Sequence, residues 1–184
     1  MCTNNALKTY LDIFGIIPMI QQGGIDYTVK DLSRFIKNEY DSLFIKYNTT
    51  PKNEIKTLCG FIIPPFQRPE VWDINRKIKL IESIIMGFDI GTLVVQWTDD
   101  EKLMHTYGWL IDGQQRLSSI RDFILGKFKI FDNKYSYDDI QNSPQIIKYR
   151  FNTYIVKFQK ISGVNVEQLK EFYHRMNYCG VPHN

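Results

Sequence analysis

Cysteine is scarce in this chain of 184 residues, which has only three. Cys2, Cys59 and Cys179 are far apart and odd in number, so neither a disulfide framework nor a zinc-binding spacing is visible. This excludes the class of small disulfide-stapled proteins. We expect three free thiols.

Long apolar runs are absent as well. No stretch is long enough to span a membrane, and the N-terminus lacks the basic region, apolar run and small-residue site of a signal peptide. We therefore expect a cytoplasmic protein without a membrane partner, in a bacterium or a phage-infected cell. The 43% of hydrophobic and 14% of aromatic residues indicate one folded globular domain.

The net charge is also small, at +3. This charge does not by itself require a nucleic-acid partner. The end of the chain is more basic, because residues 145–184 contain six basic and two acidic residues, a net +4. The basic residues are Lys148, Arg150, Lys157, Lys160, Lys170 and Arg175. If nucleic acid is bound, we expect the first four to contribute, although a solvated face explains them equally well.

The most informative stretch is residues 110–117, Leu-Ile-Asp-Gly-Gln-Gln-Arg-Leu. It is typical of a strand, a tight turn and the start of a helix, since Leu117, Ile120 and Ile124 recur at helical spacing. Gly126 suits the position that closes this helix.

This turn gathers groups that suit a phosphate and a metal ion. Gly113 allows a sharp turn or a close approach to a ligand, and the first helix amides can hold an anion. Arg116 adds a planar fork of donors for phosphate, and Asp112 could hold a divalent cation. The alternative is purely structural, because Asp-Gly is also a common hairpin turn. The pattern alone leaves both interpretations open.

Residues 61–72 form the second informative stretch. A short apolar strand runs into Pro64 and Pro65, which cannot continue a ladder. Gln67 and Arg68 are therefore expected in a rigid loop at a strand end, where ligand contacts are frequent. Alternatively, Arg68 pairs with Glu70 or another surface acid. We expect Trp72 to cover the core rather than to stack on a ligand.

The remaining pattern predicts an α/β fold. Asp73 is a plausible N-cap for a helix that ends at Gly87. Its buried face is expected to be a stripe of isoleucines, Ile74, Ile78, Ile81 and Ile85. We also expect a hairpin of strands 91–97 and 105–111, joined by an acidic turn, and short strands at 128–131 and 153–158. A last helix should begin after Asn165 and bury Val166, Leu169, Tyr173 and Met176. A lone His105 is expected to be a surface or hydrogen-bonded residue. Near the end of the last helix, Arg175 and Asn177 could approach the ligand of Arg116, or Arg175 simply favours the helix C-terminus.

The N-terminal quarter of the sequence contains no recognisable catalytic or ligand-binding motif. We expect a helical extension over residues 1–57, with a loop at 21–24 and a capping box formed by Thr28 and Asp31. The extension could cap the core or bind a partner.

Four segments together resemble a known family. Residues 63–72, 83–87, 111–117 and 172–180 are similar to motifs of the N-terminal domain of GmrSD-type, modification-dependent restriction enzymes, which has the ParB/sulfiredoxin-like superfold. The resemblance covers about residues 61–184. It implies an α+β domain at 58–184, a small mixed sheet flanked by helices.

The resemblance also implies binding of nucleotide or nucleic-acid phosphate, with Mg²⁺-dependent NTP hydrolysis that licenses DNA cleavage. On that interpretation the catalytic residues are Asp112, Gln115 and Arg116, and Asp112 positions the metal or water. The phosphate-binding residues would be Gln67, Arg68, Gly113, Gln114, Arg116, Arg175 and Asn177.

Two departures from the family pattern stand out. Cys179 occupies a position that is usually glycine. The sequence also lacks the His-Asn-His nuclease part, having only His105, His174 and His183, so we expect a sensor or NTPase domain alone, or a fragment. Two alternatives to an NTPase remain: a DNA nickase, or a non-catalytic module that binds nucleic acid or nucleotide and regulates a partner such as a nuclease subunit.

Overall fold

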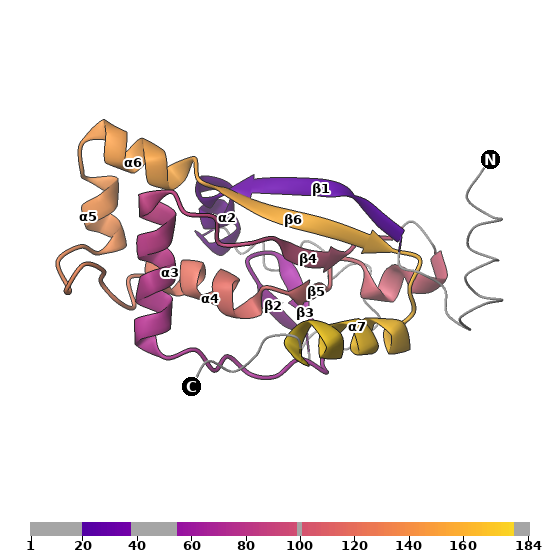
Figure 1. The fold of residues 1–184 in the computed structure, drawn as a ribbon. Helices are drawn as coiled ribbons and strands as arrows, with labels where there is room; N and C mark the ends of the chain where they lie inside the picture. The colour runs from indigo at the N-terminus through magenta and orange to yellow at the C-terminus, as the bar shows by residue number, and fades with distance from the viewer. Residues whose placement is uncertain (1–19, 38–54, 99–100, 179–184) are drawn as a thin grey trace.

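The computed structural model describes residues 20–37, 55–98 and 101–178 (Figure 1). Four strands form a mixed sheet in the order β1-β6-β4-β5. The two central strands, β6 and β4, are parallel, and the two outer strands are antiparallel to their neighbours. The strands are β1 (Ile20–Thr28), β4 (Leu93–Gln96), β5 (Leu110–Asp112) and β6 (Ile155–Ser162).

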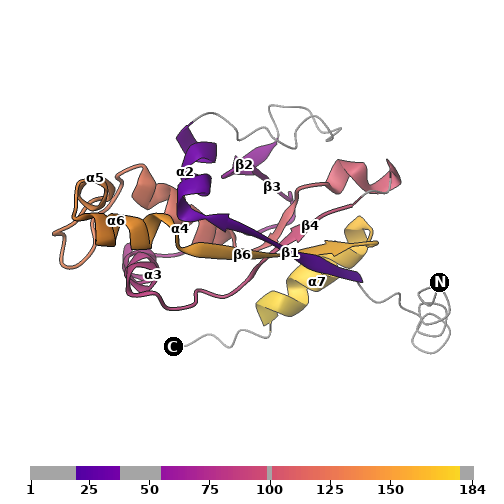
Figure 2. The same cartoon turned by 90° about the horizontal axis from the view of Figure 1, so that it is seen from above.

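A two-stranded sheet of β2 (Lys56–Leu58) and β3 (Phe61–Ile63) lies beside the main sheet. The helices are α2 (Val29–Lys37), α3 (Ile74–Met86), α4 (Gln114–Ile124), α5 (Tyr137–Gln141), α6 (Gln145–Asn152) and α7 (Val166–Tyr178). Figure 2 shows α7 on one side of the main sheet and α2 with the small sheet on the other. The predicted α+β class is confirmed.

Part of the core lies between the two sheets. Phe61 of β3 stacks on Phe158 of β6 with ring centroids 4.8 Å apart, and Tyr27 of β1 meets Phe61 edge to face at 6.0 Å. All four side chains of β4 are buried. A strand covered on both faces becomes a continuous apolar run, which is why the pattern of residues 91–97 indicates a strand so clearly.

Local end signals in the sequence correctly predicted several helix boundaries. Asp73 accepts a hydrogen bond from the Arg76 amide (2.9 Å), and α3 ends at Gly87 with a φ of 83°. Thr28 and Asp31 form the expected capping box before α2. Two residues expected to be buried, Ile74 and Met176, are instead about half exposed, at 48% and 45%.

The predicted hairpin of β4 and β5 is confirmed, but the predicted connection between the two strands was wrong. Residues 101–106 form a 3₁₀ helix rather than a turn and the start of a strand, and β5 begins only at Leu110. The backbone amide and carbonyl of Gln96 bond to Trp109 and Gly108, so the pairing starts after this 3₁₀ turn.

The prediction of a loop at residues 21–24 was wrong, because these residues belong to β1 and pair with β6. A bulge between Gln22 and Gly24 accommodates the glycines within the strand. The segment predicted to be a helical extension thus contributes a strand to the main sheet. The proposed domain boundary at residue 57 stays a prediction, and the expected helix at residues 1–18 lies outside the described residues.

The region from 128 to 152 was also incompletely predicted. Phe131, Asp132 and Asn133 have positive φ angles, so the expected strand is reduced to one bridge between Ile130 and Tyr135. Ser136 caps α5 through a capping box, and α6 follows. Helix α6 was missed because Phe151 is its single buried side chain, which leaves no apolar stripe in the sequence.

None of the helices in the described ranges has the length and hydropathy needed to cross a bilayer. Cys59 is a buried thiol, whereas Cys2 and Cys179 lie outside the described residues.

Candidate functional site

The two stretches singled out in the sequence meet in one pocket, which we call the α4 pocket. It has a volume of about 120 Å³. It is lined by Gln67, Arg68, Trp72, Ile111, Asp112, Gly113, Gln114, Gln115, Arg116, Tyr173 and Asn177. Arg175 is not among the lining residues, since its exposed side chain pairs with Glu171 at 2.7 Å.

The turn before α4 requires a glycine. Gly113 has a φ of 105°, and a Cβ at this position would overlap the side chain of Leu93. The first hydrogen bond of the helix runs from the Leu117 amide to the Gly113 carbonyl (2.9 Å). The amides of the three residues between them therefore have no partner within the helix and carry the positive end of its dipole.

The loop after β3 is tied to the strand and the last helix that flank the pocket. The Gln67 side-chain amide donates to the carbonyls of Leu110 and Ile111, the latter at 3.1 Å. The Arg68 backbone amide donates to the Tyr173 hydroxyl at 3.1 Å. These bonds hold the loop while leaving the Arg68 guanidinium exposed.

The Arg68 side chain makes no hydrogen bond or ion pair within the described part of the chain. The alternative pairing with Glu70 does not occur, because Glu70 bonds to Arg121 instead (3.0 Å). Arg68 thus offers the α4 pocket a guanidinium that has no partner among the described residues.

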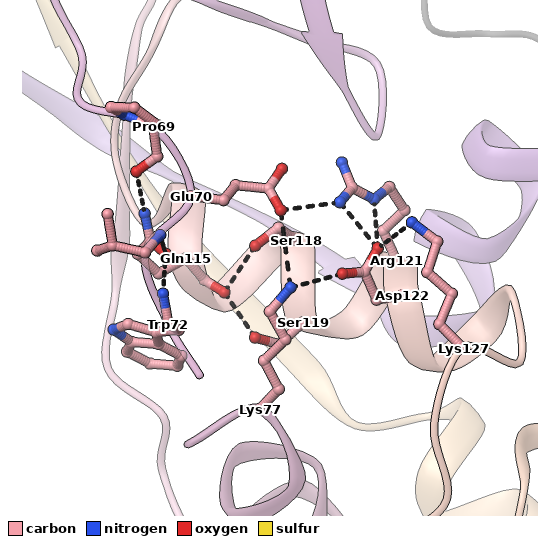
Figure 3. Close-up of polar contacts among 11 residues, drawn as sticks. Pro69, Glu70, Trp72, Lys77, Gln115, Ser118, Ser119, Arg121, Asp122 and Lys127 are labelled. Atoms are coloured by element: carbon pink, nitrogen blue, oxygen red, sulfur yellow. Dashed lines mark hydrogen bonds and ion pairs between the residues drawn. The ribbon is translucent and has the colours of Figure 1, made fainter. Parts of the chain in front are cut away.

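The side chain of Gln115, which the sequence suggested as a catalytic residue, bonds to the backbone of the loop that carries Arg68 (Figure 3). Its side-chain oxygen accepts the amides of Val71 and Trp72 at 2.9 and 3.1 Å, and its nitrogen donates to the Pro69 carbonyl at 3.1 Å. Gln115 is 9% exposed and satisfies three backbone groups that would otherwise lack partners. The geometry makes it a clamp on the loop that carries Arg68.

Both terminal nitrogens of the Arg116 guanidinium are engaged. Its guanidinium donates to the carbonyls of Ile90 and Thr92 at 2.9 and 3.2 Å, and to the Asp112 carboxylate at 2.6 Å. The close approach of Gly91 fits this arrangement, since a Cβ there would lie 2.8 Å from Arg116 Nη1. Arg116 therefore orients Asp112 and fixes the entry to β4.

A charge cluster next to the pocket was not predicted (Figure 3). Asp122 accepts hydrogen bonds from Lys77, Arg121 and Lys127 at 2.6, 2.8 and 2.8 Å, and Arg121 also bonds to Glu70 on the loop. Burial raises the pKa of Asp122, but the hydrogen bonds from Lys127, Lys77 and Arg121 outweigh burial and lower it to about 2. The sequence did hold one signal for this cluster, since Asp122 is an acidic residue within the buried face of α4.

Helix α7 contributes two further lining residues. Tyr173 packs against Phe66 with ring centroids 5.7 Å apart, and its hydroxyl holds the Arg68 amide. Asn177 donates to the Tyr173 carbonyl at 2.7 Å, which leaves its side-chain oxygen available as an acceptor. Tyr173 and Trp72 were interpreted from the sequence as packing residues, yet both line the pocket.

Asp112 is the only carboxylate among the described residues that line the pocket. In the same described ranges, no group of three His, Cys, Asp or Glu side chains could hold a metal ion. Mg²⁺ commonly binds one or two carboxylates and completes its shell with water and substrate phosphates. Asp112 fits this mode because one carboxylate oxygen bonds to Arg116 and the other is not used in that pair.

Comparison with known proteins gives one family. The family model for the GmrSD restriction endonuclease, N-terminal domain, matches residues 51–184. Neither a search of curated proteins nor a search of solved structures gives a match. The matched range is well over half of the chain and contains every residue that lines the α4 pocket. The chain therefore belongs to the family of GmrSD restriction endonuclease N-terminal domains.

Proposed function

We propose that the α4 pocket binds the terminal phosphate of a nucleoside triphosphate and that the domain hydrolyses this nucleotide with Mg²⁺ as part of DNA restriction. The observation that supports this most directly is the meeting of the Arg68 loop with the start of α4 in one pocket. Arg68, whose side chain has no partner among the described residues, and the first residues of α4, whose amides have no partner within the helix, both line this pocket.

The size of the pocket fits a phosphate group. Its volume of about 120 Å³ is well below the roughly 300–1,000 Å³ of sites that enclose a drug-sized ligand. The pocket therefore has room for one phosphate, and the rest of the nucleotide lies outside it.

The hydrogen bonds support different roles for the two arginines in this proposal. Arg68, Gln114 and the first amides of α4 contact the phosphate, whereas Arg116 and Gln115 position Asp112 and the loop. Bound Mg²⁺ would neutralise charge on the phosphates and lower the pKa of a water. Asp112 holds that ion or orients the water, and Arg68 stabilises charge that spreads over the transferring group.

The test is a phosphate-release assay on the purified chain with each NTP, with and without Mg²⁺ and DNA. We expect Mg²⁺-dependent release that falls strongly in Arg68→Ala. In the assays without DNA, Arg150→Ala is the matched control, because Arg150 is also an exposed arginine without an ion pair among the described residues, and it lies on α6.

The outcomes separate the candidate functions. Nucleotide binding without phosphate release would favour a regulatory module, in which the nucleotide controls a partner. Absence of both binding and release, with intact protein, would reject the proposal. Family membership links the domain to restriction endonucleases, so we also propose that DNA changes the rate of release.

A further inference from the structure

A second cavity lies on the same face of the main sheet as the α4 pocket, and we call it the sheet groove. Its volume is about 480 Å³. Its lining includes Gly23, Gly24, Asp26, Thr92, Lys157 and Gln159. Unlike the α4 pocket, it falls within the range of roughly 300–1,000 Å³ that small-molecule sites occupy.

The strand register connects the two cavities. Gly24 of β1 is paired with Gln159 of β6, Gln159 with Val94 of β4, and Val94 with Asp112 of β5. Paired residues in neighbouring strands project from the same face of a sheet. Asp112 and Gln159 are two strands apart, or about 10 Å at the usual strand spacing.

The pairing of β4 with β6 provides an independent check on this face. Leu93 is paired with Phe158, whose ring stacks on Phe61 of the small sheet. Successive residues of a strand point to opposite faces. Val94 and Gln159 therefore point away from the small sheet, on the face that carries the groove.

Arg116 contacts both cavities. Its Nη2 bonds to the Asp112 carboxylate in the α4 pocket at 2.6 Å and to the carbonyl of Thr92, a groove residue, at 3.2 Å. Because Val94 is buried, the route from one cavity to the other runs past this guanidinium and the exposed Thr92.

We propose that the sheet groove binds the sugar and base of the nucleotide whose terminal phosphate occupies the α4 pocket, an inference that rests on the proposed function. The polar lining suits sugar hydroxyls, because the Asp26 carboxylate accepts, and the Thr92 hydroxyl and Gln159 amide both donate and accept. Lys157, which pairs with Asp89 at 2.7 Å, supplies a cation beside the groove. The two cavities then form one nucleotide site across strands β1, β6, β4 and β5.

The test compares inorganic tripolyphosphate with ATP, GTP, CTP and UTP by calorimetric titration of the full chain in Mg²⁺. Tripolyphosphate carries the phosphates without a sugar or base, so it reports on phosphate binding without the groove's proposed ligand. We expect at least one nucleotide to bind tenfold or more tightly than tripolyphosphate. This difference is the nucleotide advantage.

Gly23 offers a way to fill the groove. A Cβ at Gly23 would meet no atom within 4 Å, so a large side chain can be added without a backbone clash. Gly23→Phe should abolish the nucleotide advantage and leave tripolyphosphate affinity unchanged, and the matched Gly23→Ala should preserve both. Asp26→Ala tests the same point by removing a polar partner, should Gly23→Phe fail to fold.

Each result supports or rejects the groove. Equal affinity of wild type for nucleotides and tripolyphosphate would reject the groove while leaving phosphate binding intact. An undiminished nucleotide advantage in folded Gly23→Phe or, if it fails to fold, in Asp26→Ala, would also reject it. If neither ligand binds wild type, the proposed function itself is wrong.

Discussion

The strongest prediction concerns the two arginines of the α4 pocket. Arg68→Ala removes an exposed guanidinium that has no partner within the described residues. Surface substitutions of this kind change stability by less than about 0.5 kcal/mol. A hydrogen bond to a charged group contributes roughly 1.5–3 kcal/mol, so affinity for tripolyphosphate or NTP should fall roughly 10- to 150-fold, since 1.4 kcal/mol is a factor of ten.

Arg116→Ala should behave differently. It removes two hydrogen bonds to carbonyls and an ion pair whose side chains are 17% and 29% exposed. Because water reaches these groups in part, we expect a net loss of about 2 kcal/mol in unfolding free energy rather than the sum of three full interactions. Binding should weaken as well, because Asp112 and the entry to β4 lose their fixed position.

Chemical denaturation and calorimetric titration of the same samples separate the two effects. Arg150→Ala serves as the control for losing an exposed arginine. Wild-type affinity in Arg68→Ala would refute the assignment of Arg68 as the phosphate ligand. Weak binding at unchanged stability in Arg116→Ala would show instead that Arg116 is the ligand.

Three further predictions can be tested with standard assays. Asp112→Asn should reduce Mg²⁺-dependent phosphate release more than nucleotide affinity, because the carboxylate holds the ion or water and not the phosphate. The pKa of Asp122 is lowered to about 2, so its ionised carboxylate contributes about 2 kcal/mol to the unfolding free energy. This contribution is complete above pH 4 and is lost as the pH falls towards 2. Acid titration followed by circular dichroism should show this loss of stability in the wild type and not in Asp122→Asn. If DNA binds, neutralising Lys148 and Arg150 should reduce the log–log salt slope by roughly 0.9 for each phosphate that is no longer neutralised; an unchanged slope would place the DNA-binding residues elsewhere.

The structure reduces the number of basic residues that we expect to bind DNA. From the sequence, Lys157 and Lys160 were candidates together with Lys148 and Arg150 on α6. Lys157 is paired with Asp89 at 2.7 Å, and Lys160 lies over the Trp97 ring at 4.3 Å. These two lysines are already engaged, so their neutralisation should have a smaller effect on DNA binding.

The sequence alone determined features that depend on neighbouring residues. Gly113 before a helical pattern indicated a strand–turn–helix unit, and its φ of 105° shows why glycine is needed. Asp73 and Asn165 marked helix starts, because each accepts a hydrogen bond from the backbone amide three residues further on. The convergence of Gln67 and Arg68 with residues 113–116 was also predictable, since both stretches follow strands.

Only the tertiary structure decided what the side chains of these motifs do. Gln115 bonds to backbone groups of residues 69–72, and Arg116 to carbonyls at 90 and 92, and neither set of partners is local in sequence. For the same reason β1 was missed, because its pairing partner β6 is distant along the chain, with Thr28 opposite Ile155. A local pattern specifies which polar groups are present, whereas their hydrogen-bond partners depend on which distant backbone atoms the packed core brings within about 3 Å.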